Sequence, residues 1–192
     1  MASPFCTIPE ALAELQAGRF IILVDDESRE NEGDLVCAAE SITPEMVNFM
    51  LTHARGVLCV ALARERCREL NLQPQTMDNT ATLHTAFTVT IDAHPRFGVS
   101  TGVSATDRAT TIRRLVDTEA TADDFLRPGH INPLIACSGG VLVRAGQTEG
   151  TVDLLRLAGM RLGGALIEIM NEDGSMARVP DLARFGQQHG IR

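Results

Sequence analysis

Apolar residues along this chain are grouped in short runs separated by polar turns, which predicts strands that alternate with helices. Most of the runs are continuous rather than alternating, and continuous apolar runs of this length are typical of strands that are buried on both faces. The segment 85–91 is instead rich in Thr, Phe and Val, which favour strands, and 141–144 follows two glycines. The predicted strands are 20–24, 35–39, 57–63, 85–91, 141–144 and 165–170.

Helices are predicted where a capping residue precedes a periodic segment. Thr7 followed by Glu10 indicates a capped first helix that stops at Gly18, and Thr43 before Pro44 begins a second. Thr148, after the turn Ala145-Gly146, is predicted to cap a later helix. The predicted helices are 8–17, 44–54, one within 101–115, 148–157 and 180–190. Because strands and helices alternate irregularly and no linker divides the chain, we expect residues 1–192 to form a single domain, with a layered mixed sheet covered by helices.

Composition and charge narrow the class of protein. The 192 residues are 44% hydrophobic and 22% charged, as in ordinary globular proteins, and the formal net charge of −8 argues against a general nucleic-acid-binding surface. No apolar stretch approaches the roughly 18 residues that a membrane-spanning helix needs, so no membrane partner is expected. The five cysteines are odd in number and form no CxxC pair, which argues against a disulfide framework or a zinc site and favours a reducing, cytoplasmic location.

The densest chemical feature is the acidic segment 25–34, DDESRENEGD, which places six carboxylates between two predicted buried strands. One interpretation is a solvated acidic loop, and the other is a cation site. Its position at strand ends, and Gly33, which allows a tight turn beside the carboxylates, favour the cation site. Oxygen ligands without cysteine suggest Mg²⁺ or Mn²⁺.

Three further features are candidates for chemistry. His130 follows the predicted turn Arg127-Pro128-Gly129, although a lone loop histidine is more often structural. Residues 144–148 form a strand-turn-helix junction at which free helix N–H groups and an arginine could bind a phosphate, a weak signal by itself. Glu168 stands alone in an apolar strand, where a carboxylate needs a partner or a purpose.

Taken together, these features resemble the 3,4-dihydroxy-2-butanone 4-phosphate synthase family of riboflavin biosynthesis. The similar segments run in order over nearly the whole chain: DDESRENEGDLV, HTAFTVTIDA, GVSATDRATTIRRL, RPGHINPL, GGVLVRAGQTEGTVDLLRLAG and ALIEIMNEDGSMAR. The resemblance implies an α+β fold, a three-layer sandwich with a mixed β-sheet covered by helices. It also implies a Mg²⁺-dependent (or Mn²⁺-dependent) lyase that converts ribulose 5-phosphate into a four-carbon ketone phosphate and formate. The family enzyme is a homodimer with its sites at the subunit interface.

The resemblance also assigns roles to residues. It implies that His130, Glu168 and Glu30 are catalytic and that Glu30 contacts the metal. The residues that it places at the substrate are Arg29, Asp34, Arg144, Gly146, Thr148 and, with a less defined role, Cys59.

Three positions depart from the family pattern. Gln147 stands where the family has a histidine that ligates the metal, and Asn132 and Ile135 replace an aromatic residue and an arginine. An amide oxygen can still coordinate Mg²⁺, so Gln147 remains a candidate ligand with weaker expected affinity. Besides the active lyase, this leaves open a paralogue with a different sugar phosphate or a partial reaction, and a dimeric binding module without catalysis. The joint presence of Glu30, His130 and Glu168 argues against the module.

Overall fold

A single six-stranded sheet organises the computed structural model, which describes residues 5–192. The order across the sheet is β1-β2-β6-β3-β5-β4. β3 and β5 run parallel, whereas the other neighbouring pairs are antiparallel, so the sheet is mixed as predicted. The strands are β1 (Ile21–Val24), β2 (Gly33–Ala38), β3 (Cys59–Leu62), β4 (Ile91–Ala93), β5 (Phe125–Ile135) and β6 (Gly163–Glu168).

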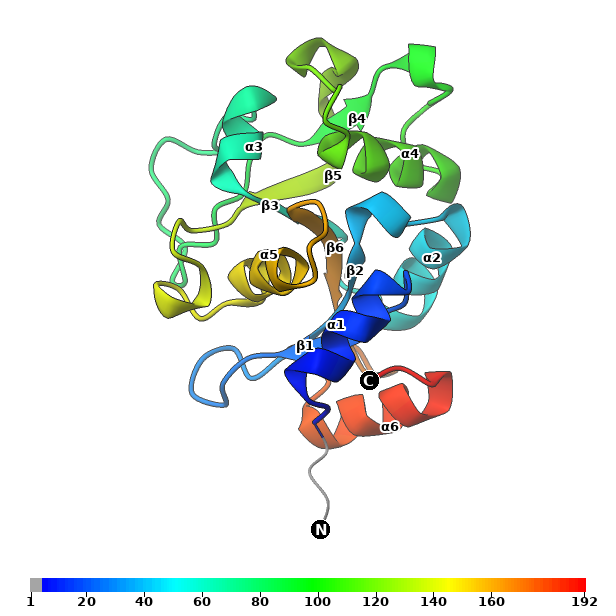
Figure 1. The fold of residues 1–192 in the computed structure, drawn as a ribbon, viewed down its shortest axis with the longest axis vertical. Helices are drawn as coiled ribbons and strands as arrows, with labels where there is room; N and C mark the ends of the chain where they lie inside the picture. Colours follow the sequence, from blue (N-terminus) through cyan, green and yellow to red (C-terminus); the bar gives the residue numbers. More distant parts are fainter. Residues whose placement is uncertain (1–4) are drawn as a thin grey trace.

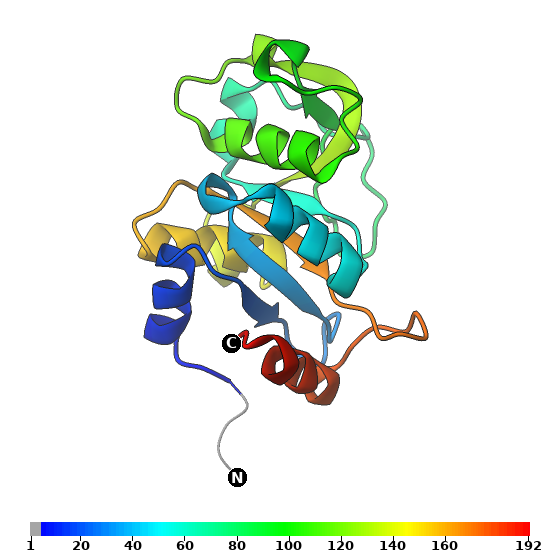
Figure 2. The same ribbon diagram turned by 90° about the vertical axis from the view of Figure 1, so that its right-hand side faces the viewer.

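Helices cover both faces of this sheet, which makes the fold an α+β sandwich of three layers. One face packs against α2 and α4, and the other against α1 and α5 (Figure 1). Figure 2 shows α6 at the β1 end of the sheet, far from α4. The helices are α1 (Ile8–Gln16), α2 (Pro44–Phe49), α3 (Arg64–Glu69), α4 (Ala105–Val116), α5 (Gln147–Leu157) and α6 (Val179–His189), and a π-helical turn, Met50–Ala54, extends α2.

The two cores explain why the strand segments read as continuous apolar runs. Leu35 and Cys37 of β2 enter one core, and Val36 and Ala38 enter the other. Successive side chains of a strand point to opposite faces. Where both faces are covered by helices, consecutive residues are all buried and are therefore apolar.

Most predicted elements are confirmed, and the helix starts agree best. Thr7 and Glu10 form a capping box at α1, Thr43 caps α2, and Gly190 ends α6 in a left-handed conformation with φ 66°. Thr148, in contrast, is not a cap. Gly146 occupies the N-cap of α5, the helix begins at Gln147, and Thr148 lies within its first turn.

Three further local predictions are wrong. The strand predicted at 141–144 is a surface 3-10 turn, Gly140–Leu142, because Gly139 and Gly140 both have positive φ and turn the chain away from the sheet. Segment 85–91 makes only isolated bridges before β4, one of them with β5 near Pro133, which has no N–H to continue a ladder. Finally, the segment Arg127–His130 is no turn but part of the eleven-residue strand β5.

No helix among residues 5–192 has both the length and the apolar character needed to cross a membrane.

Candidate active site

Eight of the sequence-predicted site residues line one small cavity of about 120 Å³. They come from the β1–β2 loop, from three neighbouring strands and from the start of α5, elements that lie far apart in the sequence. The cavity also contacts Val57, Thr85, Phe87, Leu134 and Leu166. The predicted residues that it brings together are Arg29, Glu30, Asp34, Cys59, Arg144, Gln147, Thr148 and Glu168.

Strand register explains the meeting of the two carboxylates. Asp34 of β2 is paired directly with Glu168 of β6, and Cys59 of the next strand is paired with Leu166. All three strands therefore deliver a side chain to the same end of the sheet. A polar residue in each otherwise apolar strand is thus explained by one shared site.

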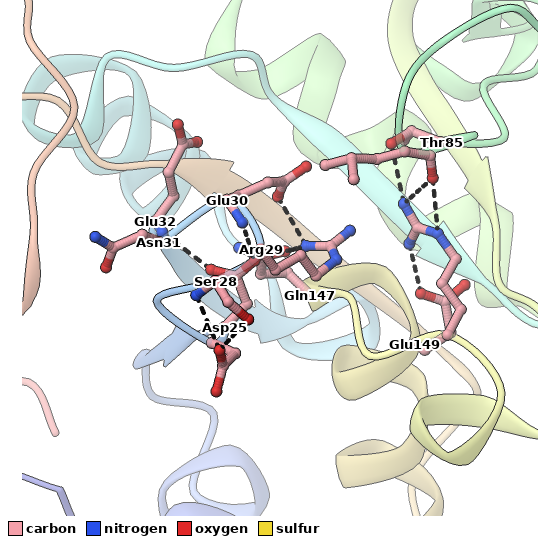
Figure 3. Close-up of polar contacts among 12 residues, drawn as sticks. Asp25, Ser28, Arg29, Glu30, Asn31, Glu32, Thr85, Gln147 and Glu149 are labelled. Carbon is pink, nitrogen blue, oxygen red and sulfur yellow. Dashed lines mark hydrogen bonds and ion pairs between the residues drawn. The ribbon is translucent and has the colours of Figure 1, made fainter.

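Arg29 contacts two carboxylates of the acidic loop and the side chain of Gln147 (Figure 3). Its Nη1 atom donates to Asp25 Oδ2 at 2.7 Å, to Glu30 Oε2 at 3.0 Å and to Gln147 Oε1 at 3.0 Å. The oxygens of Glu30 and Gln147 therefore converge on one point, which a positively charged group occupies.

Asp25 organises the loop from within. Its Oδ2 atom accepts the Glu30 N–H at 2.9 Å, and its Oδ1 atom accepts the Glu32 N–H at 3.0 Å. Burial would raise the pKa of Asp25, but these two N–H groups and the Arg29 guanidinium together lower it. Asp25 therefore stays ionised and acts as an anchor for the backbone of the loop.

Negative charge accumulates on the other side of the cavity. Asp34 is 5% exposed, and burial, followed by the carboxylates of Glu168 and Glu30, raises its pKa well above the usual range. Burial and Glu30 likewise raise the pKa of Glu32. Asp34 consequently holds a proton more readily than an ordinary aspartate. Burial, followed by the carboxylates of Glu168 and Asp34, raises the pKa of the Cys59 thiol, so Cys59 is a neutral group in the cavity wall.

Arg144 is fixed by a buried acid that the sequence analysis did not identify. Its Nη1 atom donates to Glu149 Oε2 at 2.6 Å, and Nη2 donates to Thr85 Oγ1 at 3.0 Å and to the Leu83 carbonyl at 3.2 Å. A Cβ on Gly146 would lie 2.4 Å from Arg144 Nη1, so glycine gives the guanidinium room to reach Glu149. Gly146 does not itself line the cavity, and it contributes space rather than a contact.

Gln147 has one unused hydrogen-bonding group. The residue is 6% exposed, its Oε1 atom accepts from Arg29, and its Nε2 atom has no partner among residues 5–192. A buried amide donor without an acceptor is costly, and because Gln147 lines the cavity, this N–H group is a candidate donor to a ligand there.

Glu168 is oriented by the residues that precede β3, Gly56 and Val57. Its Oε2 atom accepts the Val57 N–H at 2.8 Å, and a Cβ on Gly56 would lie 2.5 Å from the same oxygen. Glycine at position 56 thus permits the close approach that holds the carboxylate toward the cavity.

His130 is the catalytic candidate that the structure does not bring into the cavity. Its Nδ1 atom lies 2.7 Å from Asp92 Oδ2, and its backbone N–H donates to Asp92 Oδ1 at 2.9 Å. Asp92 thus fixes the orientation of the imidazole ring through Nδ1. Because the side chain is 44% exposed, the second ring nitrogen, Nε2, remains available for proton transfer.

Sequence reasoning assigned no individual role to four residues that hold the site in place. The four are Asp25, Thr85, Asp92 and Glu149, and each acts by hydrogen-bonding another site residue. Asp25 belongs to the acidic segment 25–34, which the sequence analysis singled out only as a whole. For Asp92 the available signal was a charged residue directly after a predicted strand, and for Glu149 it was a charged residue in the first turn of a helix. For Thr85 the sequence offered none.

The donor atoms suit an oxygen-preferring divalent cation, although the protein supplies few of them. No group of three His, Cys, Asp or Glu side chains in the described part of the chain is arranged to hold a metal. However, Glu30 and Gln147 direct oxygens at one point that a guanidinium nitrogen occupies, and the carboxyl groups of Asp34 and Glu168 line the same cavity. A Mg²⁺ ion with water or substrate oxygens completing its shell fits this set.

Comparisons with known proteins agree on one family. A family model described as 3,4-dihydroxy-2-butanone 4-phosphate synthase matches residues 9–192. Riboflavin biosynthesis protein RibBA of Aquifex aeolicus is 52% identical over 188 residues, which cover 98% of this chain and 46% of that protein. RibBA of Phocaeicola vulgatus is 56% identical over 186 residues, which cover 97% of this chain and 46% of that protein. The chain thus spans about half the length of these curated relatives.

Solved structures show the same fold. A two-domain 3,4-dihydroxy-2-butanone 4-phosphate synthase from A. baumannii, RibBX, superimposes with a TM-score of 0.92 at 47% identity, over 97% of this chain and 54% of that one. A 3,4-dihydroxy-2-butanone 4-phosphate synthase in complex with two magnesium ions also gives a TM-score of 0.92, at 39% identity, over 98% of this chain and 92% of that one.

Proposed function

The chain belongs to the 3,4-dihydroxy-2-butanone 4-phosphate synthase family, and from that premise we propose that it converts ribulose 5-phosphate into 3,4-dihydroxy-2-butanone 4-phosphate and formate. This reaction serves riboflavin biosynthesis. One observation carries the proposal: three carboxyl groups and two arginines line the same cavity. They are Glu30, Asp34 and Glu168, with Arg29 and Arg144.

The phosphate of the substrate is bound at the start of α5. The first N–H groups of this eleven-residue helix have no partner within the helix, and the nearby Arg144 guanidinium is directed by Glu149. Thr148 adds a hydroxyl in the first turn. Binding the phosphate here holds the sugar carbons at a fixed distance, beside Asp34 and Glu168.

Glu168 acts as the base that takes a proton from the carbon next to the ketone. The Val57 N–H fixes one carboxylate oxygen and leaves the other for this transfer. Asp34, whose raised pKa favours the protonated form, donates a hydrogen bond to a sugar oxygen. The unpartnered Nε2 of Gln147 donates to an oxygen of the same substrate.

Glu30 and Gln147 Oε1 would hold Mg²⁺ or Mn²⁺, and a known relative is seen with two magnesium ions. When bound, the ion would stabilise negative charge on the sugar oxygens. Arg29, which contacts the same two oxygens, supplies a positive charge to the anionic substrate. Asp25, which remains ionised, keeps the loop backbone in place.

A homodimer accounts for the position of His130. The imidazole and its partner Asp92 lie outside the cavity of their own subunit, on the neighbouring strands β5 and β4, and β5 also carries an exposed apolar residue, Leu126, at 46% exposure. Pairing of two chains across this face brings each His130 to the other subunit's cavity as a second proton-transfer group. The chain acts as one folded domain, and its five free cysteines favour a reducing, cytoplasmic setting.

The test is formate release from ribulose 5-phosphate in the presence of Mg²⁺. We expect the unaltered protein to release formate and E168Q to be inactive, because the amide cannot accept the proton. Q147H is assayed beside them. Silence from the unaltered protein with activity in Q147H would refute the proposed reaction for this chain and indicate a paralogue with altered chemistry.

A further inference from the structure

The acidic loop between β1 and β2 is held from two opposite sides. On one side Asp25 accepts the N–H groups of Glu30 and Glu32, as described above. On the other side the carbonyl oxygens of Glu30 and Asn31 both accept from a single side chain, Arg178, which lies about 150 residues later in the chain. The loop backbone is therefore bound through its donors and its acceptors.

Arg178 is placed for this contact by its own backbone. Its N–H donates to Asp181 Oδ2 at 3.0 Å at the start of α6, and the preceding residue, Ala177, is buried and donates to Ile169 at 3.0 Å. From this fixed position Arg178 Nη1 donates to the Glu30 carbonyl at 2.9 Å and also to the Asn31 carbonyl. Because one nitrogen donates to both carbonyl oxygens, the carbonyls of Glu30 and Asn31 must point toward the same place.

The loop conformation needs such support. Asn31 has φ 55°, in the left-handed region that L-residues adopt infrequently, although asparagine adopts it more readily than most. Two residues later, where the loop ends, a Cβ on Gly33 would lie 2.4 Å from Leu182 Cδ1, so α6 packs directly on the end of the loop. The charge of Arg178 also opposes the rise in the pKa of Glu32. The same helix thus contacts the loop through packing, hydrogen bonds and charge.

We propose that Arg178 is a positioning residue, which fixes the backbone at Glu30 and Asn31 and thereby directs the Glu30 carboxylate into the active-site cavity. No residue of α6 lines that cavity, so Arg178 at the N-cap of the helix and Leu182 within it act on the site through the loop. The inference rests on the proposed function for its catalytic consequence, whereas its structural part stands independently of the reaction.

The experiment compares R178M with R161M. Methionine keeps the aliphatic packing of the arginine stem and removes its donors. Arg161 is the control, because its side chain is 47% exposed and pairs with Glu40, away from the acidic loop and from Asp181. Amide hydrogen exchange is measured in the protein without substrate. We expect the Glu30 and Glu32 amides to exchange at least about tenfold faster in R178M, because two hydrogen bonds from a charged donor are lost, and to be unchanged in R161M.

Kinetics give a second readout that a purely structural role would not move. In R178M we expect the Mg²⁺ concentration for half-maximal formate release to rise by about tenfold, since Glu30 is no longer held toward the cation, with partial recovery in R178K. Wild-type exchange at Glu30 and Glu32 in R178M would overturn the proposal. If R178M accelerates exchange equally at core amides such as Leu35, then R178K decides: acceleration confined to the loop supports the proposal, and a uniform pattern overturns it.

The two proposals fail separately. If the unaltered protein releases no formate, the proposed function is refuted, whereas the exchange comparison still decides whether Arg178 positions the loop. If formate is released and exchange at the loop is unaffected by R178M, the proposed function stands and the positioning role is refuted.

Discussion

Replacement of Glu149 by glutamine removes the carboxylate that holds Arg144, the arginine that we propose binds the substrate phosphate. Glu149 is 1% exposed, and its two oxygens serve two donors: Oε2 accepts from Arg144 at 2.6 Å, and Oε1 accepts the Cys137 N–H at 2.8 Å. Glutamine has the same shape but only one oxygen. In E149Q one of these donors therefore faces an NH₂ group instead of an acceptor.

The expected loss follows from burial and charge. A hydrogen bond to a charged group contributes about 1.5–3 kcal/mol, and removing one partner of a buried ion pair costs about 3–5 kcal/mol. Because the Arg144 side chain is 20% exposed, water recovers part of its solvation. We therefore expect the free energy of unfolding to fall by about 2–3 kcal/mol. The KM for ribulose 5-phosphate should rise by about tenfold, with a smaller change in kcat, because a freed Arg144 binds the phosphate less well.

Urea unfolding and formate-release kinetics measure the two effects, and E69Q is the control. Glu69 also pairs with an arginine, at 2.8 Å from Arg66 Nη1, but its side chain is 61% exposed. An exposed pair of this kind contributes less than about 1 kcal/mol, and it lies outside the cavity. If E149Q and E69Q proved equal in both stability and KM, the argument from burial would be refuted.

Three further predictions concern the cavity and His130, which lies outside it. D34N should lose formate release yet gain stability relative to the unaltered protein as pH rises in metal-free buffer. Since the pKa of Asp34 is raised in the folded state, its contribution to stability is present below the unfolded pKa of about 3.9 and is lost as pH rises through the folded pKa. Asparagine does not titrate, so D34N does not lose stability in this way. Urea unfolding of both proteins across this pH range checks the sign. Q147H should lower the Mg²⁺ concentration for half-maximal activity, and direct Mn²⁺ titration should show the same order, with equal affinities contradicting a ligand role for Gln147. D92N should reduce kcat by about 10- to 100-fold with an unchanged circular dichroism spectrum, because His130 loses the carboxylate that fixes its ring; full activity in D92N would refute that role.

Helix starts and buried strands could be predicted because their causes are local. The capping box at Thr7 and the left-handed Gly190 depend on residues within one turn of the chain. The continuous apolar run of β2 follows from coverage on both faces. The family resemblance identified eight of the cavity residues for a different reason, since their motifs are preserved in order along the chain.

Other features depended on partners that a local pattern cannot reveal. The apolar run 141–144 has strand composition, yet two glycines with positive φ turn it to the surface. The long strand β5 includes Arg127–His130, although Pro128 and Gly129 give that segment the composition of a turn. Its pairing with β3 on one side and β4 on the other decides the conformation.

By itself, the sequence determined the α+β class, most elements and eight residues that line the cavity, because periodicity, caps and motifs involve neighbouring positions. Tertiary structure alone decided that Asp34 faces Glu168, that His130 stands outside its own cavity, and that Arg178 reaches the acidic loop. These relations depend on strand order and helix packing, which bring together residues separated by more than a hundred positions. Their consequences for charge and geometry exist only once the surrounding protein excludes water.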